Sequence, residues 1–283
     1  MKIKSTKIAN WERSKNFRRK IIRYERSSND RHIFLTSATA ILFQRSFGGN
    51  RFCKYFFGLP MDQAVAQGYN ISIKGFFETT HSSVMVATAK TAKIILSDMG
   101  YKGGLTVADL FTGTGLSAWA YAKEGFTVDA IEADRFTSEY AQKNLERAGV
   151  ADNITVVNTD AQSVITTSLL EGKQYAMVSL DPPWGEKYDY DLSKTFRLEH
   201  TEPSLEHLIR LSIPLAPVIV FRTPQSIDVE QVNALGVALN RQVLIQFQDM
   251  EGYPSSEQTA AIFMIASVGN HTLEHVKIVP TEF

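Results

Sequence analysis

From about residue 104, the sequence alternates short apolar runs with segments of helical periodicity, and this alternation limits the possible folds more than any other feature. Such alternation is typical of a parallel β-sheet whose crossover connections are helices. Five runs have the length and composition of buried strands: 105–111, 127–133, 154–158, 175–180 and 217–222. The clearest helix is predicted at 135–149, where Gly149 would end it as a left-handed cap.

Two further apolar runs, 242–250 and 259–267, are separated only by the segment EGYPSSEQ. This connection is too short for a crossover helix, so the two runs are predicted to form an antiparallel hairpin. The sequence therefore predicts an α/β fold with a Rossmann-like seven-stranded sheet, made of five parallel strands and a C-terminal antiparallel hairpin.

The charge of the chain is unevenly distributed, although the formal net charge is zero. Residues 1–54 carry 14 Lys and Arg against 3 Asp and Glu, and the remaining residues carry 16 against 27. Basic residues interleaved with aromatic ones are typical of a nucleic-acid-binding segment. The alternative is a helical face that docks onto the acidic body of the same protein. We expect a basic, helical N-terminal extension over 1–70 and an α/β domain over 71–283.

The cysteine count and the hydropathy limit the possible sites and locations. Cys53 is the single cysteine, so the chain cannot form an intrachain disulfide or a cysteine-rich zinc site. No His, Cys or Asp cluster has the spacing of metal ligands, and we expect no metal. No apolar run approaches the roughly 20 residues that span a bilayer. We therefore expect a cytoplasmic protein without a membrane partner; the sequence does not indicate an oligomeric state.

A glycine-containing turn follows the first predicted strand in the segment DLFTGTG, residues 109–115. Gly113 and Gly115 permit positive φ angles and let the backbone approach a ligand beside a helix N-terminus. The third glycine of the dinucleotide fingerprint is missing, which disfavours a dehydrogenase. Alone, the two glycines predict no more than a tight strand-to-helix turn.

Acidic residues close three successive predicted strands. Asp109, with the glycine turn, would face the amino-acid part of a ligand. Glu132 would accept hydrogen bonds from ribose hydroxyls, and Asp160 would meet an adenine amino group. Taken singly, Asp109 and Asp160 could cap helices and Glu132 could be solvated. Three acids at one edge of one sheet indicate S-adenosylmethionine as the cofactor.

The segment DPPW, residues 181–184, follows the fourth predicted strand, which must end at its prolines. The Asp181 carboxylate and the Pro182 carbonyl could accept the two hydrogens of a planar amine and turn its lone pair toward a methyl group. Trp184 would provide a flat face for the ring. This pattern predicts N-methylation; the alternative is a strand end with a surface tryptophan. Arg222, after the fifth strand, could bind an anion of the acceptor or form a structural salt bridge.

These motifs resemble those of class I, Rossmann-like S-adenosylmethionine-dependent methyltransferases, namely DLFTGTG, IEAD (131–134) and DPPW. A narrower resemblance, over roughly 70–267, is to the trimethylguanosine synthase family of RNA cap guanine-N2 methyltransferases. It is carried by PPWG with the following loop EKYDYD, and by segments 75–90 and 220–235. The resemblance implies that Phe77 lines the donor pocket, that Thr80 helps to hold the donor carboxylate, and that Trp184 stacks on guanine. It also implies that the extension over 1–70 completes the acceptor site of a methyltransferase domain over 71–283. We also expect Phe111, which lies within the first motif, to bind the donor.

The chain departs from the family pattern at several positions. Asp181 stands where the cap enzymes tend to have serine, Glu186 replaces a glycine, Phe76 a tryptophan and His81 a proline. We expect an S-adenosylmethionine-dependent N-methyltransferase acting on the exocyclic or ring nitrogen of a guanine-like base in RNA. The alternatives are a small-molecule N-methyltransferase for a planar heteroaromatic metabolite and a catalytically silent, methyltransferase-like RNA-binding module.

Overall fold

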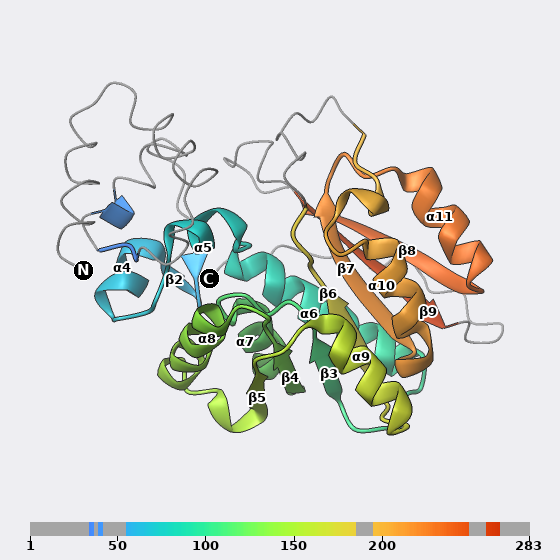
Figure 1. Ribbon diagram of the computed structural model, residues 1–283, viewed down its shortest axis with the longest axis horizontal. Helices are drawn as coiled ribbons and strands as arrows, with labels where there is room; N and C mark the ends of the chain where they lie inside the picture. The colour runs from blue at the N-terminus through green and yellow to red at the C-terminus, as the bar shows by residue number, and fades with distance from the viewer. Residues whose placement is uncertain (1–33, 37–38, 42–54, 185–194, 249–258, 267–283) are drawn as a thin grey trace.

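The protein is described by a computed structural model over residues 34–36, 39–41, 55–184, 195–248 and 259–266 (Figure 1). Its centre is a seven-stranded sheet in the order β5-β4-β3-β6-β7-β9-β8. The strands are β3 (Thr106–Asp109), β4 (Thr127–Ile131), β5 (Ile154–Val157), β6 (Met177–Leu180), β7 (Val218–Pro224), β8 (Arg241–Gln248) and β9 (Thr259–Ala266). Strands β3, β4, β5, β6 and β7 are parallel to one another, and β9 is antiparallel to both β7 and β8. The predicted Rossmann-like methyltransferase sheet is confirmed.

The strand order creates a switch point between β3 and β6. The chain runs outward from β3 through β4 to β5, and then returns to place β6 on the other side of β3. In doubly wound sheets, ligands bind beyond the carboxyl ends of the strands at such a point. The topology thus directs attention to the residues that follow β3 and β6.

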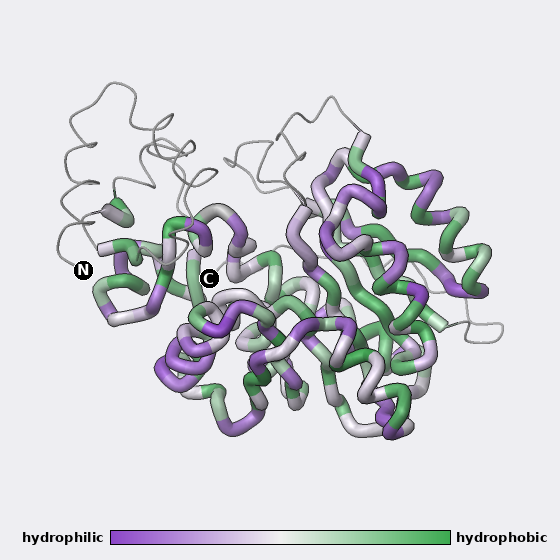
Figure 2. The backbone as a smooth tube through the Cα atoms, in the orientation of Figure 1, coloured by the Kyte–Doolittle hydropathy of each residue, from purple (hydrophilic) through white to green (hydrophobic). Residues whose placement is uncertain are grey.

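Helices cover both faces of the sheet (Figure 1). The labelled helices are α4 (Met61–Ala66), α5 (Ile73–Glu78), α6 (Ser82–Asp98), α7 (Leu116–Lys123), α8 (Arg135–Arg147), α9 (Ala161–Leu170), α10 (Leu205–Ser212) and α11 (Val229–Ala238), with short 3-10 turns η2 (Ala151–Asn153), η3 (Leu198–His200) and η4 (Ile213–Leu215). Of these, α4 and α5 lie to the side of the sheet (Figure 1). Side chains alternate along each strand, so Val107 and Val218 enter the core under α6 and α7, whereas Val178 and Ile219 enter the core under α9, α10 and α11. Figure 2 shows this apolar sheet between helices with hydrophilic outer faces.

The described part of residues 1–70 packs on the same core as the sheet. Phe56 and Phe57, in and after β1 (Tyr55–Phe56), which pairs with β2 (Leu59–Pro60), are buried in the cluster that contains Val107. The buried amide of Asn144 accepts a hydrogen bond from the Asn70 backbone N–H at 2.7 Å and donates to the carbonyls of Asn70 and Thr114, both at 3.1 Å. This contact connects the N-terminal segment to the glycine turn. Most of the basic, helical extension predicted over 1–70, including residues 1–33, lies outside the described residues.

The strand ends differ slightly from those predicted. β3 ends at Asp109 rather than 111, because the chain turns there toward the glycines. β7 continues to Pro224, since its antiparallel pairing with β9 extends to Thr259. Helix α8 ends at Arg147, two residues before Gly149, whose φ of 69° is the predicted left-handed conformation. Among the described residues, no helix has both the length and the apolar character needed to cross a membrane.

Candidate functional site

Four neighbouring strands bring predicted site residues together at the carboxyl edge of the sheet. Asp109 is the last residue of β3, Glu132 follows β4, Asp181 follows β6, and Arg222 lies in β7. Because these strands are parallel and adjacent, the side chains meet although they come from distant parts of the sequence. This edge includes the switch point between β3 and β6.

The glycine turn after β3 adopts the conformation that the sequence predicts. Gly113 has a φ of 53° and Gly115, the N-terminal cap of α7, has a φ of 92°, values that favour glycine. A methyl group added at Gly113 would meet no atom within 4 Å, whereas one at Gly115 would lie 3.1 Å from Leu145 Cγ. The turn is thus open to a ligand at Gly113 and packed against the protein at Gly115.

Asp109 is a buried carboxylate below this turn, with 1% of the residue exposed. Its Oδ2 accepts a hydrogen bond from the Ser117 hydroxyl at 2.5 Å, so it does not cap a helix. Burial is the largest cause that raises the pKa of Asp109, hydrogen bonds partly offset it, and the charge of Asp181 adds to the rise; the resulting pKa is about 6. Ser117 gave no sequence signal of its own, although it stands in the first turn of the helix after the glycines.

The other two predicted acids have different surroundings. Glu132 accepts backbone hydrogen bonds from Gly113 at 3.1 Å and from Asp134 at 2.9 Å, and burial raises its pKa. Asp160 is exposed and caps α9, where hydrogen bonds from the Ser163 hydroxyl at 2.6 Å and backbone at 2.9 Å lower its pKa. The capping alternative for Asp160 is therefore observed, and its contact with adenine stays a prediction.

Helix α5 lies against the glycine turn. The hydroxyls of Thr79 and Thr114 are 3.2 Å apart, and a methyl group at Gly75 would lie 3.0 Å from Thr114 Cγ2. The segment that contains Phe77 and Thr80 therefore lies beside the glycine turn, where Thr79 makes the contact with Thr114. The Phe77 side chain is outside the described residues, and the roles of Phe77 and Thr80 toward the donor stay predictions. Phe111 is half-buried directly after β3 and packs against the core under α9, α10 and α11.

Asp181 is held by a buried arginine. The Arg222 guanidinium, in a residue only 4% exposed, donates from Nη1 to Asp181 Oδ2 at 3.3 Å and from Nη2 to the Thr259 hydroxyl at 3.1 Å. The Asp181 side chain is 31% exposed, so part of it is accessible from outside the protein. Burial raises the pKa of Asp181, while Arg222 and a hydrogen bond from Trp184 lower it. The geometry thus shows the salt bridge that was one of the two readings of Arg222.

Trp184 is half-buried beside Asp181 and packs on a residue that the sequence did not reveal. Its ring centroid lies 6.2 Å from that of Phe196 at an interplanar angle of 61°, and Phe196 in turn contacts His200. Pro182 is buried, and the Pro183 carbonyl accepts a hydrogen bond from the Glu202 backbone at 3.1 Å. Phe196 lies in no motif, which explains why it was missed.

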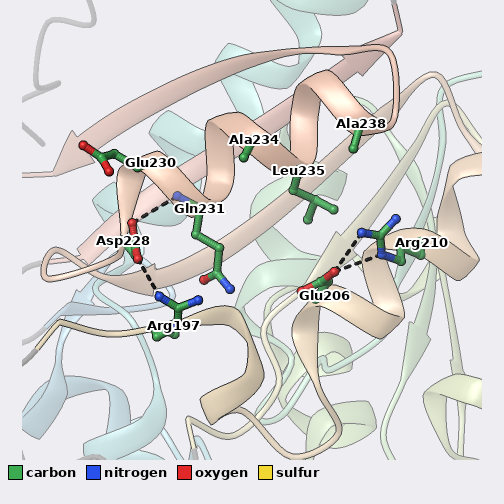
Figure 3. A pocket seen from close by; sticks show the side chains of 9 residues that line it. All are labelled: Arg197, Glu206, Arg210, Asp228, Glu230, Gln231, Ala234, Leu235 and Ala238. Atoms are coloured by element: carbon green, nitrogen blue, oxygen red, sulfur yellow. Dashed lines mark hydrogen bonds and ion pairs between the residues drawn. The ribbon is translucent and has the colours of Figure 1, made fainter.

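A pocket of about 510 Å³ lies elsewhere, between α10 and α11 (Figure 3). Four of its charged side chains form two ion pairs: Arg197 with Asp228 at 2.9 Å, and Arg210 with Glu206 at 2.8 Å. It contains none of the predicted site residues. Within the described part of the chain, no group of three or more His, Cys, Asp or Glu could hold a metal ion.

The residues at the carboxyl edge fit S-adenosylmethionine. This cofactor carries a sulfonium and an ammonium group, and a nearby positive charge would favour the ionised form of the buried Asp109. The open backbone at Gly113, beside the N-terminus of α7, leaves room for a ligand to approach. The carboxylate of Glu132 follows the neighbouring strand and is bonded to the same glycine turn.

Comparisons with known proteins identify methyltransferases as relatives of this chain. A family model described as RNA cap guanine-N2 methyltransferase matches residues 105–263, more than half of the chain. The ribosomal protein L11 methyltransferase of Desulfitobacterium hafniense is 34% identical over 86 residues, which are 30% of this chain and only 26% of that protein. Solved structures with a similar fold include a SAM-dependent methyltransferase from Agrobacterium tumefaciens. It has 17% identity and a TM-score of 0.46, and the match covers 66% of this chain and 62% of that one. The METTL16 MTase domain has 17% identity and a TM-score of 0.46, over 62% of this chain and 66% of that one.

Proposed function

Because this chain belongs to the RNA cap guanine-N2 methyltransferase family, and is an S-adenosylmethionine-dependent methyltransferase, we propose that it methylates the exocyclic or ring nitrogen of a guanine-like base in RNA. The observation that carries this proposal is the position of Asp181 and Trp184. They follow β6, the strand next to β3, and so stand beside the glycine turn that follows β3.

The donor side of the site is formed by residues around that turn. Asp109 and the backbone at Gly113 and Gly115 face the amino-acid part of S-adenosylmethionine, and Glu132 accepts hydrogen bonds from its ribose. Phe77, Thr80, Phe111 and Asp160 complete this pocket. The position of α5 against Thr114 supports the assignment of Phe77 and Thr80. When bound, the cofactor supplies a methyl carbon made electrophilic by the positively charged sulfur.

The acceptor side is formed by Asp181, Pro182 and Trp184. The amine of a guanine is a weak nucleophile because its lone pair is delocalised into the ring. The Asp181 carboxylate and the Pro182 carbonyl accept its two N–H hydrogens, hold the lone pair toward the donor and stabilise the positive charge that develops on nitrogen. Trp184 presents its ring to the base, and Phe196 supports Trp184 from the protein side.

Asp181 is also suited to take up the proton that the nitrogen loses. Transfer of the methyl group to nitrogen would break the carbon–sulfur bond, whose electron pair would stay on sulfur. The nitrogen would then carry a surplus proton, and the Asp181 carboxylate would accept it. Burial raises the pKa of Asp181 above its ordinary value, which makes the carboxylate a better base. The Asp181 side chain is partly exposed, so an acceptor can reach it although Arg222 is paired with it.

The proposal is tested by methyl transfer from radiolabelled S-adenosylmethionine to a matched panel. The panel contains RNA with a 7-methylguanosine cap, the same RNA without the cap, free guanosine nucleotides and planar heteroaromatic amines. The expected product is RNA methylated on a guanine nitrogen, identified by nucleoside analysis. Turnover of free heterocycles alone would instead identify a metabolite methyltransferase, and donor binding without any transfer would identify a silent RNA-binding module.

A further inference from the structure

Asp181 and Arg222 are placed side by side by the register of two parallel strands. Leu180 of β6 is paired with Phe221 of β7, so the next residue of each strand points to the same region of the carboxyl edge. Their side chains form an ion pair of 3.3 Å between Nη1 and Oδ2. This contact makes Arg222 the charged neighbour of the residue to which we assign the acceptor amine.

The guanidinium is fixed on several sides. Besides Asp181, it donates to the Thr259 hydroxyl at 3.1 Å and to the Met85 sulfur at 3.4 Å. Met85 in α6 and Thr259 in β9 are themselves buried, 3% and 7% exposed. To bind an acceptor phosphate, Arg222 would have to leave this enclosure and abandon Asp181, at the cost of an unpaired charge.

From these contacts we propose that Arg222 is a positioning residue, which keeps the Asp181 carboxylate ionised and fixes its orientation beside the acceptor amine. Arg222 does not itself contact the acceptor. This inference rests on the role of Asp181 given under the proposed function, and it replaces anion binding as the function of Arg222.

The charges around Asp181 make this role necessary. Among the described residues, Asp109 faces it from β3 and Arg222 from β7, and the Trp184 indole donates a hydrogen bond to it. The charge of Asp181 also contributes to raising the pKa of the Tyr121 phenol in α7. Without Arg222, the partly buried Asp181 carboxylate would lie next to the carboxylate of Asp109 and would lose the positive charge beside it. Both effects favour the protonated form, which cannot accept a proton from the amine.

The first test compares Arg222→Met and Arg222→Lys with the wild-type enzyme. Arg222→Met is expected to lower kcat at least about tenfold and to move the acidic limb of the pH–rate profile to higher pH. The KM for S-adenosylmethionine should stay within about twofold. Arg222→Lys, which keeps a positive charge, should recover part of the rate. An unchanged acidic limb in both variants would overturn the proposal.

A double-mutant cycle separates positioning from general damage. If Arg222 acts through Asp181, then Asp181→Asn combined with Arg222→Met should be no slower than Asp181→Asn alone. Independent, multiplying losses would overturn the proposal. Arg241→Met is the matched control, because Arg241 in β8 donates to the carbonyls of Pro217 and Ile213 away from the site. It should lower stability without moving the pH profile.

A readout without an acceptor keeps this inference distinct from the proposed function. Trp184 bonds to Asp181, so its fluorescence should report the protonation of that carboxylate. The transition is measured in an Asp109→Asn background, and the signal of Trp184 is isolated by subtracting that of a Trp184→Phe variant. We expect the pH of this transition to rise by about one unit or more in Arg222→Met. An unmoved transition refutes the role of Arg222 whatever the enzyme methylates. A shifted transition in a protein that transfers no methyl group would refute the proposed function alone.

Discussion

The negative charge of Asp181 raises the pKa of Asp109, because the two residues lie at the carboxyl ends of the neighbouring parallel strands β3 and β6. Burial is the larger cause, and together the effects bring the pKa of Asp109 to about 6. Without a bound cation, the Asp109 carboxylate therefore ionises only at a higher pH than an ordinary aspartate. A positively charged cofactor would reverse this preference, which gives two measurable consequences.

The first consequence concerns stability. The pKa of Asp109 is raised above its unfolded value of 3.8, so the folded state binds the proton more tightly than the unfolded state between about pH 4 and 6. Stability from this group is present below that range and is lost as the pH rises through 6. Asp109→Asn should therefore increase the free energy of unfolding at pH 7 by about 1 to 3 kcal/mol, and by much less at pH 4.

Urea unfolding at the two pH values measures this difference. The control is Asp152→Asn, at an exposed position in η2, which should change the free energy of unfolding little at either pH. A loss of stability at pH 7 in Asp109→Asn would show that the buried carboxylate is stabilising as it stands.

The second consequence concerns cofactor affinity. If ionised Asp109 faces the cationic donor, the affinity for S-adenosylmethionine should fall as the pH drops below about 6, approaching tenfold per pH unit. Calorimetric titrations between pH 5 and 8 would measure this. Asp109→Asn should bind weakly throughout and lose the pH dependence. An affinity of the wild-type protein that stays constant across this range would place Asp109 outside the donor site.

Replacing Trp184 should weaken binding of the acceptor and leave binding of the donor nearly unchanged. Stacking on a base is worth about 1 to 3 kcal/mol, so Trp184→Ala should raise the KM for RNA roughly 5- to 150-fold. The dissociation constant of S-adenosylmethionine should change little. Trp184→Phe, which keeps a flat ring but loses the hydrogen bond to Asp181, should keep most of the RNA affinity and lose part of kcat. A selective loss of donor binding in Trp184→Ala would contradict this assignment.

The basic charge of residues 1–54 should give RNA binding a steep dependence on salt. This segment carries 14 Lys and Arg, and each phosphate contact adds about 0.9 to the slope of log affinity against log salt for a duplex, or about 0.7 for a single strand. Replacing Arg18, Arg19 and Lys20 by Gln should reduce the slope by about 2 if all three contact phosphates. The control replaces Lys102, Lys123 and Lys143 of the catalytic domain. Equal slopes for wild type and the arm variant would favour docking of the arm on the acidic body.

Much of the fold could be predicted because its signals are local. Each of the seven strands is an apolar run bounded by turn residues, and the short connection before β9 excludes a crossover helix. The meeting of Asp109, Glu132 and Asp181 followed from parallel strands ending at one edge. The strand ends were less accurate: only the pairing with β9 explains why β7 reaches Pro224.

The supporting residues could not be predicted, since their roles depend on contacts between distant segments. Asn144 looks like an ordinary polar residue of a helix, yet it is completely buried and bonds to Asn70 and Thr114. Phe196 supports Trp184 from a segment without a motif. Asp160 shows the reverse: its position after a strand suggested a ligand contact, and the structure shows a helix cap.

The central claim is that the residues after β6 hold an amine beside the cofactor that is bound after β3. A single-turnover assay tests it most directly, with S-adenosylmethionine affinity measured on the same preparations of wild type, Asp181→Asn and Asp181→Ala. Asp181→Ala should bind the cofactor within about threefold of wild type yet transfer the methyl group at least about a hundredfold more slowly, with Asp181→Asn in between. Transfer at a near-normal rate by Asp181→Ala would contradict the account.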